Sequence, residues 1–105
     1  METPNLDYLR QISGGDIDFE NSLLSILKLE FPIEYIVLSN NFKNSNFDKV
    51  ALDIHKIKHK IGMLGMLNSV DLASECEKNI RKGNTEQYKD LVLILERINV
   101  YLKNK

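Results

Sequence analysis

The stretch FDKVALDIHKIKHKIGMLGM, residues 47–66, decides how the rest of the chain is interpreted. Its apolar residues recur every three or four positions, which is the spacing of one face of an α-helix. They are Phe47, Val50, Ile54, Ile57, Ile61 and Leu64. We therefore predict an amphipathic helix that starts near Ser45 or Asn46 and stops at Gly65.

Upstream of this stretch, proline and glycine divide the chain into two further helices. Pro4–Ser13 is predicted to be a short helix capped by Thr3 and ended by Gly14-Gly15. It should bury Leu6, Leu9 and Ile12. A second helix should begin at a cap formed by Asp16 or Asp18 and should kink or break at Pro32. Its expected apolar positions are Phe19, Leu23, Ile26, Leu27, Phe31, Ile36 and Val37.

Downstream, two more helices are indicated. Asn68 is the expected cap of the first, whose stripe contains Leu72, Ala73, Cys76 and Ile80 and which Gly83 ends. Asn84 or Thr85 is the expected cap of the second, whose apolar face contains Tyr88, Leu91, Leu95, Ile98 and Leu102. Amphipathic helices with short connections typically pack as bundles. We expect an all-α chain, an antiparallel four-helix bundle with a short extra N-terminal helix, as a single domain over residues 1–105.

Composition narrows the class of protein. The 105 residues carry a formal net charge of −1 and 28% charged side chains, whereas a dedicated nucleic-acid binder usually shows a basic excess. The single cysteine, Cys76, cannot form an intramolecular disulfide or a multi-cysteine zinc site. No apolar run approaches about 20 residues, and the N-terminus lacks signal-peptide features. The expectation is a soluble, cytoplasmic, monomeric protein.

The residues that could take part in a reaction lie beside the apolar stripe of the 47–66 helix. His55, Lys58, His59 and Gly62 are spaced by three, four and seven residues, so they share a neighbouring face that should border solvent. A neutral imidazole is a usable nucleophile at physiological pH. Lys58 could attract a phosphoryl group on His55, and Gly62 could leave a flat landing area for a partner's backbone.

These residues resemble the motif of histidine-containing phosphotransfer (HPt) domains of bacterial two-component phosphorelays. That motif has the form His-x-hydrophobic-Lys-Gly followed by a Leu-Gly pair. Here it is matched by His55, Ile57, Lys58 and Leu64-Gly65. The chain departs from it at His59, where the family usually has glycine. The resemblance covers most of the chain, but its specific part is residues 55–65.

The resemblance implies that His55 accepts a phosphoryl group from a receiver-domain phospho-aspartate and passes it to another receiver. It implies response-regulator receivers or hybrid sensor histidine kinases as partners, with no cofactor and no independent catalytic activity. The alternative is a pseudo-HPt adaptor that binds a receiver without transfer, which His59 makes credible. We expect no metal site, because His55 and His59 have ligand spacing but the Glu-x-x-His element is absent. Lys56, Lys58 and Lys60 are interpreted as a solvated helix face, without nucleic acid or membrane insertion.

Overall fold

The computed structural model describes residues 2–105, and this part of the chain contains five α-helices and no β-strand. The helices are α1 (Asp7–Ser13), α2 (Ile17–Lys43), α3 (Phe47–Met63), α4 (Leu67–Arg81) and α5 (Tyr88–Lys103). The predicted all-α class is thus confirmed. None of the helices in residues 2–105 is both long enough and apolar enough to cross a membrane.

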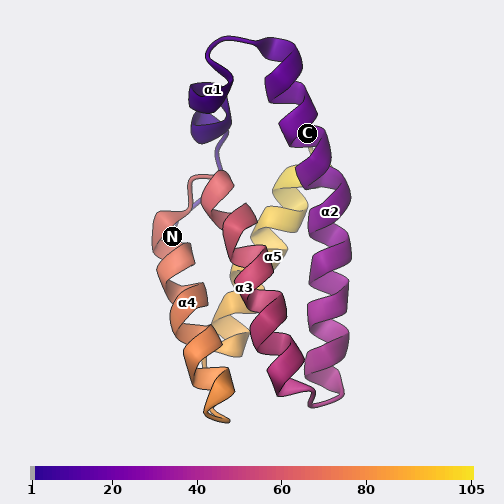
Figure 1. The fold of residues 1–105 in the computed structure, drawn as a ribbon, viewed down its shortest axis with the longest axis vertical. Helices are drawn as coiled ribbons and strands as arrows, with labels where there is room; N and C mark the ends of the chain where they lie inside the picture. The colour runs from indigo at the N-terminus through magenta and orange to yellow at the C-terminus, as the bar shows by residue number, and fades with distance from the viewer. Residues whose placement is uncertain (1) are drawn as a thin grey trace.

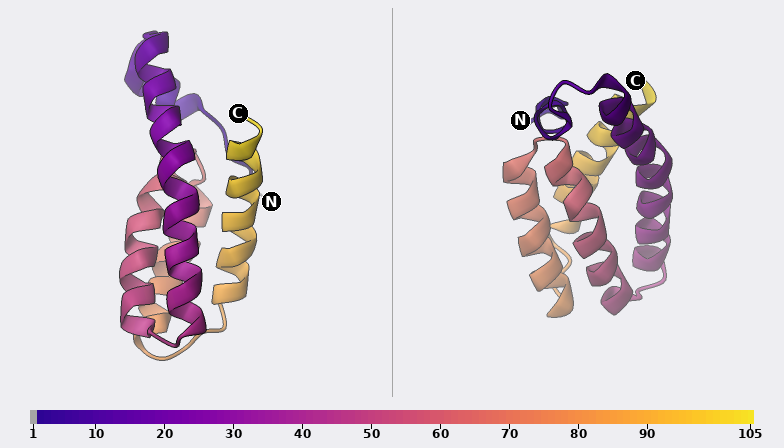
Figure 2. Two further views of the ribbon diagram at one scale, coloured as in Figure 1. Left: turned by 90° about the vertical axis from the view of Figure 1, so that its right-hand side faces the viewer. Right: turned by 45° about the horizontal axis from the view of Figure 1, so that its top comes forward.

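The helix α3 occupies the centre of the molecule. It lies between α2 and α4 and packs against each of them more extensively than any other two helices pack together (Figure 1). The helix α5 lies behind, against α2 and α4, while α1 and the first turns of α2 form one end of the elongated molecule (Figure 2). The predicted histidine helix is therefore the most extensively packed of the five.

The apolar stripe of α3 packs as predicted. Val50, Ile54, Ile57, Ile61 and Leu64 are all fully buried. The helix ends at Met63, and Gly65 follows with a φ of +77°, a left-handed conformation that favours glycine. This stripe fixes the rotation of α3, so the residues between its members must face outward or towards α2 and α4.

The N-terminal helix is shorter than predicted. It begins at Asp7, so the expectation of a helix from Pro4 with Thr3 as its cap is wrong. Pro4 is instead buried in a non-helical arm, where the backbone N–H of Asn5 donates to the carbonyl of Leu64 at 2.9 Å. Burial of Leu6 and Leu9 is confirmed, but Ile12 is exposed. The arm belongs to the packing of the α3–α4 turn, and a local capping pattern cannot reveal that contact.

The helix α2 differs from its prediction at Pro32 and on its outer side. Asp16 caps it, since its Oδ1 accepts from the N–H of Phe19 at 3.0 Å. The helix runs unbroken through Pro32, because the single lost N–H is outweighed by buried Phe31 and Leu38 on either side. Four side chains assigned to the core are exposed in the structure: Phe19, Ile26, Ile36 and Val37.

The start of α4 also corrects a prediction. The helix begins at Leu67, and Asn68 is not its cap. The backbone N–H groups of Asn68 and Ser69 donate to the Glu2 carboxylate at 2.9 and 2.8 Å, and the Ser69 hydroxyl donates at 2.7 Å. Glu2 therefore satisfies the free amides of this helix end from the other end of the chain. Burial alone would raise the pKa of Glu2, but these hydrogen bonds lower it below 4.5.

The last two helices confirm the predicted stripes. Ala73, Cys76 and Ile80 of α4 are buried, and so are Leu91, Leu95, Ile98 and Leu102 of α5. The helix α5 begins at Tyr88, after a turn in which Asn84 Oδ1 accepts from the N–H of Glu86 at 3.0 Å. The polar residues expected to cap α5 thus shape the turn that precedes it.

Candidate functional site

The central feature of the site is His55, which α3 presents to solvent. Its neighbour Ile54 is fully buried, and this anchors the helix so that the His55 side chain stays 56% exposed. The imidazole is held on a rigid helix rather than on a loop. It is thus accessible to a partner and limited in its motion, as a residue that reacts with an incoming protein must be.

The nearest polar neighbour of His55 comes from α4. His55 Nδ1 lies 3.4 Å from Oε1 of Glu77, and Lys58 Nζ lies 3.5 Å from the same oxygen. Arg81 Nη2 lies 3.4 Å from the other carboxylate oxygen of Glu77. We call these four residues, His55, Lys58, Glu77 and Arg81, the Glu77 cluster. It brings together the two best-matched motif residues and two that the motif does not contain.

The neighbours of Glu77 stabilise the negative charge of its carboxylate. Burial alone would raise the pKa of this carboxyl, but the Lys58 ammonium and the contacts from His55 and Arg81 lower it. Glu77 is therefore ionised at neutral pH. An ionised carboxylate beside Nδ1 favours the imidazole tautomer that carries its proton on Nδ1.

This arrangement leaves the second ring nitrogen of His55 free. Within residues 2–105, His55 Nε2 has no hydrogen-bond partner, while Nδ1 faces Glu77. When Nδ1 carries the proton, Nε2 has an available lone pair. The cluster therefore orients the imidazole through Nδ1 and leaves Nε2 without a competing hydrogen bond.

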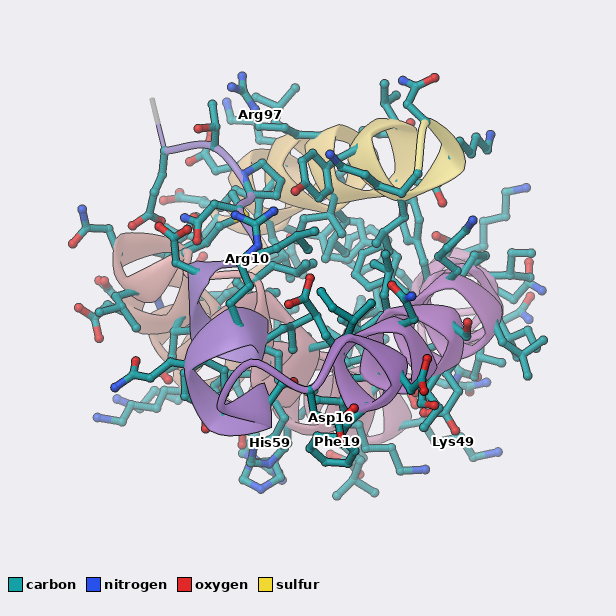
Figure 3. All side chains as sticks on the ribbon, turned by 90° about the horizontal axis from the view of Figure 1, so that it is seen from above. Arg10, Asp16, Phe19, Lys49, His59 and Arg97 are labelled. Carbon is teal, nitrogen blue, oxygen red and sulfur yellow. The ribbon has the colours of Figure 1, made fainter. Side chains whose placement is uncertain are left out.

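The second histidine lies one turn further along α3. His59 is exposed, and its ring meets that of His55 edge to face, with centroids 5.5 Å apart and an interplanar angle of 89°. Figure 3 shows the His59 ring at the periphery of the molecule, directed away from the helices. Anything that docks over His55 would also meet His59.

Gly62 and the lysines occupy less open positions than His59. A Cβ built on Gly62 would lie 3.5 Å from Val70 Cγ2 of α4, an ordinary van der Waals contact, so the missing side chain faces that helix. Lys60 pairs with Glu34 at 2.7 Å and with Glu30 at 3.1 Å. Since Lys58 also pairs with Glu77, the alternating lysines Lys56, Lys58 and Lys60 do not form one free basic surface.

The structure adds residues that sequence reasoning missed. Glu77 and Arg81 lie four residues apart on α4, next to the stripe that contains Cys76 and Ile80. Their spacing marks one helix face, but only the packing of α4 against α3 shows that this face meets His55. Within residues 2–105, no group of three or more His, Cys, Asp or Glu side chains is placed to hold a metal ion.

Comparisons of the chain with protein-family models, with curated proteins and with solved structures found no match.

Proposed function

We propose that this chain is an HPt domain in which His55 accepts a phosphoryl group from a receiver-domain phospho-aspartate and passes it to another receiver. One observation carries the proposal: an exposed imidazole on a rigid helix has its Nδ1 beside an ionised carboxylate, and its Nε2 has no hydrogen-bond partner within residues 2–105. The HPt-like spacing of His55, Lys58 and Leu64-Gly65 supports the same function.

The transfer step is a simple exchange at phosphorus. Nε2 of His55 attacks in line, the new N–P bond forms, and the bond between phosphorus and the aspartyl oxygen breaks, which leaves the aspartate as a free carboxylate. The proton stays on Nδ1, and Glu77, 3.4 Å away, stabilises the positive charge that develops on the ring. The acidic residues and Mg²⁺ of the receiver stabilise the moving phosphoryl group. Alone, the chain would catalyse no reaction.

Lys58 would bind the phosphoryl group once it has been transferred to His55. Its ammonium contacts Glu77 on the same side as His55 and is one helical turn away along α3. A phosphoryl group adds negative charge and acceptor oxygens close to it. A short rotation of the flexible lysine stem can then turn the ammonium from Glu77 to the phosphoryl oxygens.

We also infer how the helices are arranged and in which setting the domain works. Successive long helices are joined by short turns (Figure 1), which supports an antiparallel four-helix bundle of α2–α5 with α1 as the extra helix. We place the whole chain, residues 1–105, in one bacterial, cytoplasmic phosphorelay domain. Its partners would be receiver domains or hybrid sensor histidine kinases.

A pseudo-HPt adaptor is the second candidate function, and His59 favours it. Its ring lies against that of His55, where the family usually has glycine. A side chain at this position occupies space that an approaching receiver needs. The adaptor would bind a receiver over α3 but would not move the phosphoryl group.

The test is transfer of phosphate from a phosphorylated receiver domain, or from a hybrid kinase with ATP, followed by intact-mass analysis. The expected product is a phosphohistidine that is labile in acid and stable in base, with no label in His55→Gln. His59→Gln is the matched control, because it removes the other imidazole of the same helix and should keep the label. Label in His55→Gln would contradict the assignment, and tight receiver binding without transfer would favour the adaptor.

Glu77 has its own test within this proposal. Glu77→Gln keeps the shape but removes the charge, so it should slow transfer about tenfold or more while His55 remains the labelled residue. Nitrogen-15 NMR of the His55 ring should show the Nδ1-protonated tautomer in the native chain and a mixture in Glu77→Gln. An unchanged tautomer would show that Glu77 does not orient the ring.

A further inference from the structure

His59 places a second imidazole beside the nitrogen that we propose to be phosphorylated. Its ring meets that of His55 edge to face, with centroids 5.5 Å apart, and it lies at the periphery of the molecule (Figure 3). Of the two histidines in residues 2–105, only His55 has a hydrogen bond or an ion pair. The ring nitrogens of His59 are therefore free to bind another group.

Two lysines of α3 are less available than His59. Lys60 is held by Glu34 at 2.7 Å and by Glu30 at 3.1 Å. Lys58 lies 3.5 Å from Glu77 and must leave it to reach a phosphoryl group. His59 has no such contact to break, so no protein partner competes with its binding of a new anion.

The separation of the two rings brings His59 within reach of a phosphoryl group on His55. Such a group extends the His55 ring by one N–P and one P–O bond, and a charge-assisted hydrogen bond to its oxygens spans about 2.7–2.9 Å more. Both histidines are exposed, so the His59 ring can turn about its own side-chain bonds to meet these oxygens. An imidazole has an N–H donor in its neutral and protonated forms, and phosphoryl oxygens are strong acceptors.

Given the phosphotransfer function above, on which this inference rests, we propose that His59 donates a hydrogen bond to a phosphoryl oxygen on His55 and stabilises the phosphorylated chain. The phosphoryl group stays on Nε2 of His55, and no covalent bond to His59 forms. Glu77 contacts Nδ1, while Lys58 and His59, three and four residues further on, bind the oxygens from the next helical turn. The glycine that HPt domains usually have at this position offers no such donor. His59 therefore favours retention of the group by this chain over its return to the receiver.

The first experiment measures the lifetime of the phosphohistidine without a receiver. Phosphoramidate, a small phosphoryl donor that reacts with imidazoles, labels the full chain, and phosphorus-31 NMR follows the loss of the label at neutral pH. His59→Phe keeps a ring but removes both nitrogens, so it should shorten the half-life about three- to tenfold, the effect of one hydrogen bond. His59→Gln retains a donor and should stay close to the native half-life.

Lys56→Gln is the matched control for this experiment. Lys56 is an exposed cation next to His55 in the sequence, but neighbours in the sequence do not face each other on a helix. Its replacement should leave the half-life unchanged. Circular dichroism melts establish that all three variants remain folded. Equal half-lives of the native chain and His59→Phe, or label on His59 in peptide mass mapping, overturn the proposal.

The second experiment separates the role of His59 from phosphotransfer itself. At equilibrium with a phosphorylated receiver, the ratio of label on the chain to label on the receiver should be about three- to tenfold smaller for His59→Phe than for the native chain. Transfer with an unchanged ratio overturns only the role of His59. A half-life that depends on His59, without any transfer from a receiver, overturns only the phosphotransfer function. A chain that takes no label at His55 from either donor overturns both.

Discussion

The helices α2 and α3 lie side by side, yet their sequences specify their surroundings very differently. In α3, most of the large apolar residues gather on one face, which the structure buries almost completely, and Leu52 is the exposed exception. In α2, apolar residues occupy two opposite faces, of which only the one with Leu27, Phe31 and Leu38 is buried. A helical period fixes the orientation of a helix only where there is a single stripe to follow.

The largest expected effect separates the buried face of α3 from the exposed face of α2. Ile57→Ala in α3 removes a fully buried side chain and should lower the free energy of unfolding by about 2–5 kcal/mol. Leu29→Ala in α2 removes a side chain of the same size and should change it by less than about 0.5 kcal/mol. Urea unfolding measures both. Equal losses would show that the outer face of α2, where Leu29 lies, is part of the core.

A smaller effect concerns the helix ends, where α2 and α4 differ. Asp16 caps α2 locally, whereas Glu2 caps α4 from the N-terminal arm. Glu2→Ala should lower the free energy of unfolding by about 1 kcal/mol, as loss of a cap does. Glu75→Ala is the matched control, because Glu75 is an exposed glutamate on α4, the helix whose end Glu2 caps.

The pH dependence of the Glu2 effect has a definite sign. The pKa of Glu2 is lowered on folding, so its contribution is present above the ordinary value of 4.5 and is lost as pH falls through the lower folded value. The difference between the native chain and Glu2→Ala should therefore be full at pH 7 and shrink below pH 4.5. Urea titrations across this range measure it, and a difference that grows in acid would contradict the capping role.

The smallest expected effect concerns Gly62 of α3. Gly62 is inside the helix, and an added methyl would make only an ordinary contact with Val70. Gly62→Ala should therefore raise the free energy of unfolding by about 0.5–1 kcal/mol. Thermal unfolding would register this gain. If the same variant weakens receiver binding, Gly62 serves the docking surface, whereas a loss of stability would show that α3 and α4 cannot admit the methyl.

Sequence reasoning succeeded where the determining interactions are local. The stripe of α3, the Asp16 cap and the end of α3 at Gly65 all follow from residues within a few positions of one another. It failed where distant segments meet. Pro32 is tolerated because of core contacts on either side, and the end of α4 is capped by Glu2 instead of by Asn68. A local pattern reveals neither of these contacts.

The same distinction applies to the candidate site. His55 and Lys58 were found because their spacing along one helix is diagnostic. Glu77 was missed because its contact with His55 spans 22 positions of the chain and depends on how α4 packs on α3. Residues on the nucleophile's own helix can be inferred from periodicity, whereas the residues that orient it require the tertiary structure.

The Glu2 contact has a consequence for the order of folding. The amides that Glu2 accepts from are 66 and 67 positions away, so the first turn of α4 gains its cap only after nearly two thirds of the chain has closed into a loop. The first turn of α2, with Asp16 three positions from its donor, faces no such delay. Hydrogen exchange during refolding should thus protect Phe19 before Asn68 and Ser69, whose amides act as reporters of arm docking.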